Sequence, residues 1–191
     1  MKYQQAIAAF ISIAAIIFAA SFKDKGDHEP WCNFPKTFKP TMKTADTTVD
    51  IARYMGTWYE IVRKGGDAFQ GNCICSQADY SLSADKTFVN VDNTCIDKFH
   101  RKEEAVGTAY SQNAQNTQLE VYFNPKVGGN YWILALDTNY GYVLVGEPCR
   151  KMLWVLSRQK TLDKAIVDQL LQVAYGQGYT SDNLVYRNPS C

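Results

Sequence analysis

The chain has 191 residues, with 20 Lys and Arg against 19 Asp and Glu and a formal net charge of +1. This length suits one domain. The balanced charge argues against the basic stripe of a nucleic-acid-binding protein, and it indicates no strong attraction to an anionic membrane. We therefore expect no nucleic-acid partner, and membrane contact is not indicated.

The first 21 residues have the features of a secretory signal peptide. Lys2 provides a short basic start, residues 6–20 are almost all apolar, and Ala19 and Ser21 offer small side chains for cleavage after Ser21. A membrane span needs roughly 20 apolar residues, and this run is shorter. The pattern predicts a signal peptide over residues 1–21 and a secreted, extracellular protein.

Six cysteines follow the predicted signal peptide. An even number in an exported chain predicts three disulfides formed in an oxidising compartment. The alternative is a metal site at the Cys73-x-Cys75 motif, but zinc sites usually show two such paired motifs, and the chain has one. We expect no metal and no cofactor. The cysteines are Cys32, Cys73, Cys75, Cys95, Cys149 and Cys191.

The remaining chain divides into an arm and a run of strands. Residues 22–50 contain three prolines and no periodic apolar pattern, which predicts an irregular arm. From residue 56 onward, alternating apolar and polar segments separated by turn signals predict eight strands. The expected strands are residues 56–62, 76–82, 87–91, 105–111, 119–123, 131–136, 142–146 and 152–157.

One helix and a short extra strand follow. Thr161 is a plausible N-cap, and Gly176 or Gly178 ends the helix. Its expected apolar positions are Leu162, Ile166, Leu170 and Val173. The close spacing of the strands favours an all-β protein, an eight-stranded up-and-down antiparallel barrel with this C-terminal α-helix packed outside. The extra strand is expected over residues 183–187. Pattern alone does not distinguish the barrel from a β-sandwich.

Three short motifs carry a resemblance to a known family. They are Gly56-Thr57-Trp58-Tyr59-Glu60, Asp137-Thr138-Asn139-Tyr140, and Arg158 at the end of residues 154–158. With the segments 77–82 and 131–135, they resemble the lipocalin family, most closely its apolipoprotein D and bacterial lipocalin branch. The resemblance covers a domain of residues 51–191. It implies a barrel whose interior holds one small apolar molecule.

The resemblance gives the motif residues structural roles. It implies that Trp58 closes one end of the barrel and that Arg158 stacks across its ring, a cation–π contact. Gly56 permits close approach of the chain at the barrel floor. The residues expected to act structurally are Gly56, Trp58, Asp137, Tyr140 and Arg158.

Candidate ligand-binding residues follow from strand parity together with the resemblance. Side chains alternate along a strand, so an inward Arg158 places Trp154 and Leu156 inside. Leu119, Val121 and Phe123 form an apolar face, and matching to the family adds four positions in two earlier strands. The set is Tyr80, Phe88, Asn90, Asp92, Leu119, Val121, Phe123, Trp154 and Leu156. The resemblance implies a ligand held without a covalent bond: a fatty acid, lysolipid, sterol, retinoid or pigment.

The disulfide pairing is partly open. The resemblance implies Cys32–Cys149 and Cys75–Cys191, which leaves Cys73 for Cys95. A hairpin that pairs Ser83 with Thr87 instead places Cys75 opposite Cys95 and leaves Cys73 for Cys191.

Two alternatives to a carrier are a cavity enzyme and a partner-binding scaffold with no natural ligand. An enzyme of the lipocalin type would need a free thiol or acidic residues inside the barrel, and Asp92 is one acidic candidate. His28 and His100 are expected in the arm and in a loop. We therefore expect no catalytic residues. A scaffold would use the loops 65–71 and 125–130 as contact surfaces, and its receptor is unknown.

Overall fold

The computed structural model describes residues 41–65, 73–188 and 191, all of which belong to one compact unit. The predicted signal peptide and most of the predicted arm lie outside these residues. Among the described residues, none of the helices is both long and apolar enough to span a membrane.

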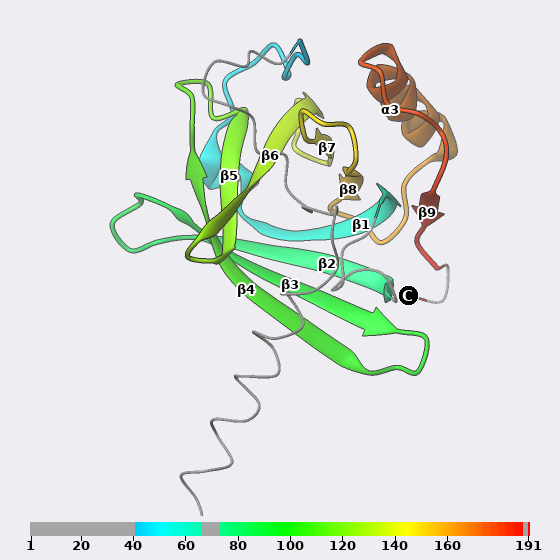
Figure 1. Ribbon diagram of the computed structural model, residues 1–191, viewed down its shortest axis with the longest axis horizontal. Coiled ribbons are helices and arrows are strands. Elements are labelled where there is room, and N and C mark those ends of the chain that lie inside the picture. The colour runs from blue at the N-terminus through cyan, green and yellow to red at the C-terminus, as the bar shows by residue number, and fades with distance from the viewer. Residues whose placement is uncertain (1–40, 66–72, 189–190) are drawn as a thin grey trace, which may run out of the picture. The chain divides into compact units, whose positions relative to one another are not determined.

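The described strands form one antiparallel barrel (Figure 1). Each of the first seven strands pairs with the next, and β1 closes the barrel by pairing with both β8 and β2. The predicted eight-stranded up-and-down barrel is confirmed. The strands are β1 (Gly56–Lys64), β2 (Cys73–Leu82), β3 (Val89–Asp97), β4 (Lys102–Ser111), β5 (Gln118–Asn124), β6 (Val127–Leu136), β7 (Tyr142–Gly146), β8 (Leu153–Ser157) and the extra strand β9 (Leu184–Tyr186), which pairs with β1.

In the described part of the chain, two helices accompany the barrel. The one-turn helix α2 (Ile51–Tyr54) precedes β1, and its N-cap Asp50 accepts backbone hydrogen bonds from Ala52 and Arg53. Helix α3 (Lys164–Gly176) follows β8 and packs outside the barrel (Figure 1).

The details of α3 differ from the expectation. Its N-cap is Asp163, whose carboxylate accepts from the backbone N–H of Ala165 at 2.7 Å, and not Thr161. Val173, expected on the apolar face, is 40% exposed. The buried stripe is displaced by about one residue around the helix from the expected one, because the side chains one position later face the barrel. That stripe consists of Val167, Leu170, Leu171 and Ala174.

The protein has two apolar cores, one on each side of the barrel wall. The outer core lies between α3 and the strands and contains Val62, Trp132 and Val155 together with the buried face of the helix. The inner core lies inside the barrel and contains Trp58, Ile133 and Val143. Strand residues therefore alternate between two buried environments, which explains why β7 and β8 are apolar on both faces.

Two disulfides are described, Cys73–Cys95 and Cys75–Cys191. The pairing implied by the resemblance is therefore the one observed. The alternative assumed the wrong hairpin register, because Leu82 pairs with Val89 and this places Ser76, not Cys75, opposite Cys95. Cys149 is also disulfide-bonded, and its predicted partner Cys32 lies outside the described residues.

Candidate functional site

The closed end of the barrel is built around Trp58, whose side chain has no exposed surface. Its indole Nε1 donates to the Tyr54 carbonyl at 2.9 Å. The Arg158 guanidinium lies 3.8 Å from the Trp58 ring centroid and donates to the carbonyls of Thr57 at 2.8 Å and Met55 at 2.7 Å. One side chain thus joins the end of β8 to α2 and the start of β1.

The β6–β7 turn supports this closed end. The Asp137 carboxylate accepts from the Gly141 backbone N–H at 3.0 Å, and the Gly141 carbonyl accepts from the Arg158 N–H at 2.9 Å. The Tyr140 hydroxyl accepts from the Asp50 N–H at 2.9 Å, although Tyr140 itself adopts a positive φ of 61°. These groups hold the barrel floor.

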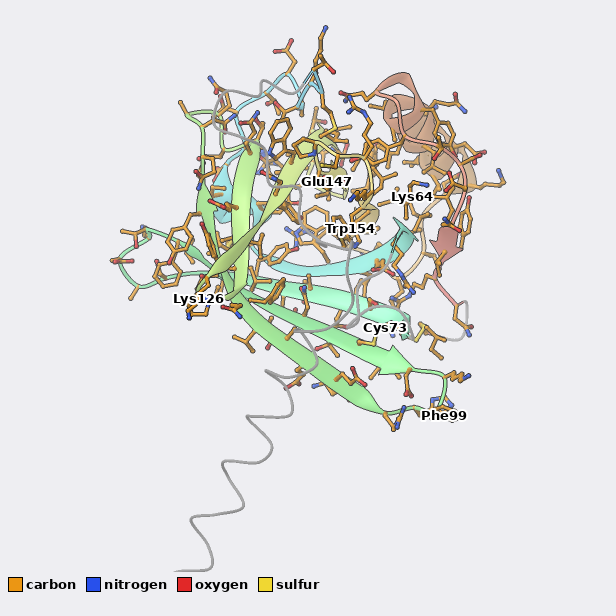
Figure 2. All side chains as sticks on the ribbon, viewed as in Figure 1. Lys64, Cys73, Phe99, Lys126, Glu147 and Trp154 are labelled. Carbon is orange, nitrogen blue, oxygen red and sulfur yellow. A yellow bond between two sulfur atoms is a disulfide. The ribbon has the colours of Figure 1, made fainter. Side chains whose placement is uncertain are left out.

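Five of the nine candidate ligand-binding residues meet on the inner face of the barrel. Leu119, Val121 and Leu156 are buried in the inner core, and Tyr80 and Trp154 pack against it while keeping accessible surface. Trp154, labelled in Figure 2, lies beside the end of β1, where it pairs with Arg63.

Phe123 lies at the end of β5 and is 38% exposed. Its ring covers Gly107, where an added Cβ would come within 2.8 Å of the ring. Gly107 is paired with Val91, a residue of the inner core, so the Phe123 ring lies on the interior side at the edge of the barrel. A β-bulge between Tyr122 and Asn124 interrupts the alternation there.

The expectation that Phe88, Asn90 and Asp92 face the interior is wrong. Val89 and Val91 are the residues of β3 that enter the inner core, so the positions between them point outward. Asn90 and Asp92 are exposed, and the Phe88 ring packs on Tyr110 at 5.7 Å between centroids. The expected inward positions on β3 differ by one residue from the observed ones. Because successive side chains point to opposite faces of a strand, a difference of one residue exchanges its inner and outer faces.

Three tyrosine hydroxyls meet inside the barrel. The hydroxyls of Tyr54 and Tyr131 are 2.8 Å apart, and Tyr80 donates to the Tyr131 hydroxyl at 3.4 Å. Burial raises the pKa of all three phenols well above the ordinary value. They therefore stay uncharged at neutral pH and act as hydrogen-bonding groups in an apolar wall.

A buried ion pair, missed by the sequence reasoning, also belongs to the interior. The Arg63 Nη1 donates to Glu60 Oε1 at 2.7 Å, and the two side chains are only 6% and 7% exposed. Glu60 pairs with Leu156 of the inner core, and Arg63 pairs with Trp154. Arg63 Nη2 also donates to the Cys73 carbonyl at 3.2 Å.

A signal for one member of this pair was present in the sequence. Glu60 is two residues after Trp58, so an inward Trp58 implies an inward Glu60. Arg63 has the opposite parity. It reaches the interior because a β-bulge between Glu60 and Val62 shifts the alternation by one residue.

Two further polar side chains on the inner face were also missed. Ser76 Oγ on β2 and Asn93 Oδ1 on β3 are buried atoms without a hydrogen-bond partner in the described part of the chain. Ser76 shares the parity of Ala78 and Tyr80, and Asn93 that of Val91. The interior thus combines apolar side chains with a small number of polar groups, as small-molecule sites do.

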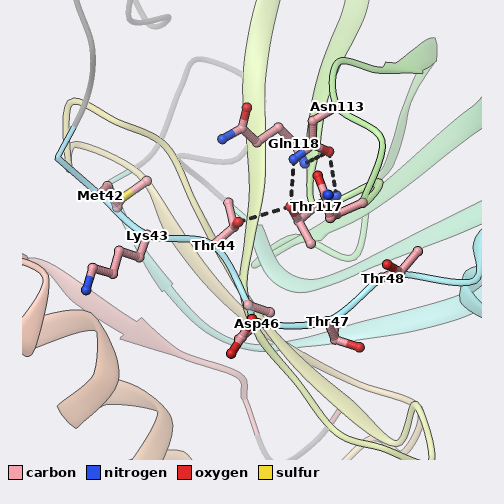
Figure 3. Close-up of a pocket in the computed structure, with 11 residues that line it drawn as sticks. Met42, Lys43, Thr44, Asp46, Thr47, Thr48, Asn113, Thr117 and Gln118 are labelled. Atoms are coloured by element: carbon pink, nitrogen blue, oxygen red, sulfur yellow. Dashed lines mark hydrogen bonds between the residues drawn. The ribbon is translucent and has the colours of Figure 1, made fainter.

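A pocket of about 670 Å³ lies outside the barrel, between residues 42–48 and residues 113–118 (Figure 3). Three of its polar side chains have hydrogen-bond partners within the pocket. Thr117 Oγ1 donates to Thr44 Oγ1 at 3.0 Å, and Asn113 Oδ1 accepts from the backbone N–H groups of Thr117 and Gln118. Because these groups are already satisfied, we place the candidate site in the barrel interior.

Comparison with known proteins agrees with the barrel and its motifs. The model of the lipocalin-like domain matches residues 49–189. The outer membrane lipoprotein Blc of Citrobacter freundii is 34% identical over 150 residues, which are 77% of this chain and 83% of that protein. Mouse apolipoprotein D is 34% identical over 108 residues, or 56% of this chain and 54% of that protein.

A solved structure shows the same fold at low identity. The cockroach allergen Per a 4 superposes with a TM-score of 0.61 and 17% identity, covering 78% of this chain and 94% of that one. The family match spans the whole described barrel, from the residue before the Asp50 cap to β9. The chain therefore belongs to the lipocalin family, in the branch that includes apolipoprotein D and the bacterial lipocalins.

Proposed function

We propose that the protein is a secreted carrier that holds one small hydrophobic ligand, without a covalent bond, inside its barrel. The observation that carries the proposal is the accessible surface left on inward-facing side chains. Tyr80, Tyr131 and Trp154 all face the inner core, yet each keeps accessible surface. A barrel filled by its own side chains would bury them. An eight-stranded barrel encloses about enough room for one small ligand.

The energetics are adequate for a carrier. A ligand that loses roughly 300 Å² of apolar surface gains about 7.5 kcal/mol at about 25 cal/mol per Å², before the cost of immobilising it. The net value corresponds to micromolar or weaker binding, which suits reversible uptake and release.

Binding is favoured over catalysis by the state of the cysteines. All five described cysteines are disulfide-bonded, so none of them supplies the thiolate that a thiol-dependent enzyme of this family would use. The same disulfides support an oxidising, extracellular location, in agreement with the signal peptide predicted over residues 1–21.

Native mass spectrometry of the oxidised protein, before and after exposure to a mixed lipid extract, tests the proposal. We expect a retained mass of a few hundred daltons. Ligand addition should also change tryptophan fluorescence through Trp154, and Trp154→Phe should abolish most of that change. Trp132→Phe is the matched control, because Trp132 is buried in the outer core. An unliganded mass in both runs would overturn the proposal and favour the partner-binding scaffold.

A further inference from the structure

We infer that the polar head of the ligand is an uncharged hydroxyl group, held between Ser76 and Asn93 on the inner face of the barrel. This inference rests on the proposed carrier function and specifies the ligand class. It selects long-chain or cyclic alcohols and excludes fatty-acid anions as the preferred ligand.

The two residues lie side by side on paired strands. Ala78 of β2 pairs with Asn93 of β3, and Ser76 pairs with Cys95. Ser76 and Asn93 are therefore diagonal neighbours on one face, with Cα atoms about 7 Å apart. At that separation one oxygen atom can reach both side chains.

Both residues carry unsatisfied polar atoms. Ser76 is 7% exposed, and neither its Oγ nor Asn93 Oδ1 has a hydrogen-bond partner among the residues that the structure describes. The three tyrosine hydroxyls of the interior, in contrast, bond one another. Native proteins satisfy the large majority of buried polar atoms. Two unsatisfied atoms on adjacent inward-facing positions therefore point to a partner that the described residues do not provide.

The charge of the neighbourhood favours a neutral partner. The Arg63 guanidinium is already bonded to Glu60 at 2.7 Å, so this buried pair has no net charge. A carboxylate head brought beside it would be desolvated without a surplus cation to compensate, which is costly. An uncharged head avoids this cost.

The hydrogen-bonding pattern then selects a hydroxyl. Asn93 Oδ1 can only accept, so its partner must donate, whereas the Ser76 hydroxyl can donate to the same partner. An alcohol oxygen does both at once. A carboxylate has no proton to donate, and neither does an ester.

The test compares three probes with the same chain, decanol, decanoate and methyl decanoate, by isothermal titration of the full oxidised protein. We expect decanol to bind about tenfold more tightly than either other probe, the value of one net hydrogen bond. Ser76→Ala and Asn93→Leu should each remove most of this preference. The matched controls are Ser81→Ala and Asn90→Ala, exposed positions on the same two strands, which should keep it.

Stability provides an independent measurement. Because no described residue bonds the Ser76 hydroxyl, Ser76→Ala should not lower the thermal midpoint of the ligand-free protein. A lower midpoint would show a structural bond and overturn the inference. The inference would also be overturned if decanoate bound more tightly than decanol, if methyl decanoate bound as tightly as decanol, or if both variants kept the preference for decanol. None of these three results would contradict the carrier function. Failure of all three probes to bind would count against the carrier function itself.

Discussion

Replacing Arg158 by alanine should destabilise the barrel floor without greatly changing ligand affinity. The guanidinium stacks 3.8 Å from the Trp58 ring centroid. It also donates to the carbonyls of Thr57 at 2.8 Å, Met55 at 2.7 Å and Tyr54 at 3.1 Å. Removing the side chain breaks the connection between β8 and the segment that leads into β1.

The expected loss follows from these contacts. The cation–π contact contributes about 1 kcal/mol. The hydrogen bonds carry a charged donor, but Arg158 is only partly buried, so water replaces part of their energy and we assign them about 2 kcal/mol in total. The free energy of unfolding should therefore fall by about 3 kcal/mol. Arg158→Lys should recover only a small part of this lost free energy, because a lysine ammonium lacks the planar set of N–H donors that a guanidinium offers.

Denaturant unfolding followed by circular dichroism measures this loss, with Arg53→Ala as the control. Arg53 also lies over an aromatic ring, at 4.1 Å from the Tyr140 centroid, but it is exposed, and its removal should cost less than about 1 kcal/mol. Equal losses in the two variants would refute the assigned role of the buried contacts. If Arg158→Ala greatly lowered ligand affinity while stability stayed unchanged, the claim that Arg158 stabilises the barrel floor and takes no part in ligand binding would be refuted.

Other consequences can be measured in the same way. Glu60→Gln removes the counter-charge of the buried Arg63 and should lower the free energy of unfolding by about 3 kcal/mol or more. An unchanged free energy of unfolding would contradict a stabilising role for this buried ion pair. Replacing both cysteines of Cys75–Cys191, separated by 116 residues, should cost about 5 kcal/mol, against about 3 for Cys73–Cys95, separated by 22; the reverse order would contradict the loop-entropy account. Burial raises the pKa of Tyr80, so the folded state keeps a proton that the unfolded state loses above about pH 10. Stability should fall as pH rises past that value, and Tyr80→Phe should make the fall shallower by about 1.4 kcal/mol per pH unit; identical slopes would exclude the shift.

Much of the barrel could be predicted because its signals are local. Alternation, turn residues and the Gly56–Glu60 motif each depend on a few neighbouring positions, and together they predicted eight strands and an outer helix. Leu119, Val121 and Leu156 were placed correctly on the inner face, because no irregularity separates them from the residues used to set the parity of their strands.

The polar part of the site depended on tertiary structure. The bulge after Glu60 brings Arg63 inside, and the register of the β2–β3 hairpin decides that Asn93 faces inward while Asn90 and Asp92 face out. A shift of one residue reverses the face of every later side chain in a strand. The sequence, through its strand pattern together with its family resemblance, therefore determined the barrel and its apolar walls. Only the packed, paired strands decided which polar groups the interior contains, because that choice depends on single-residue shifts between strands.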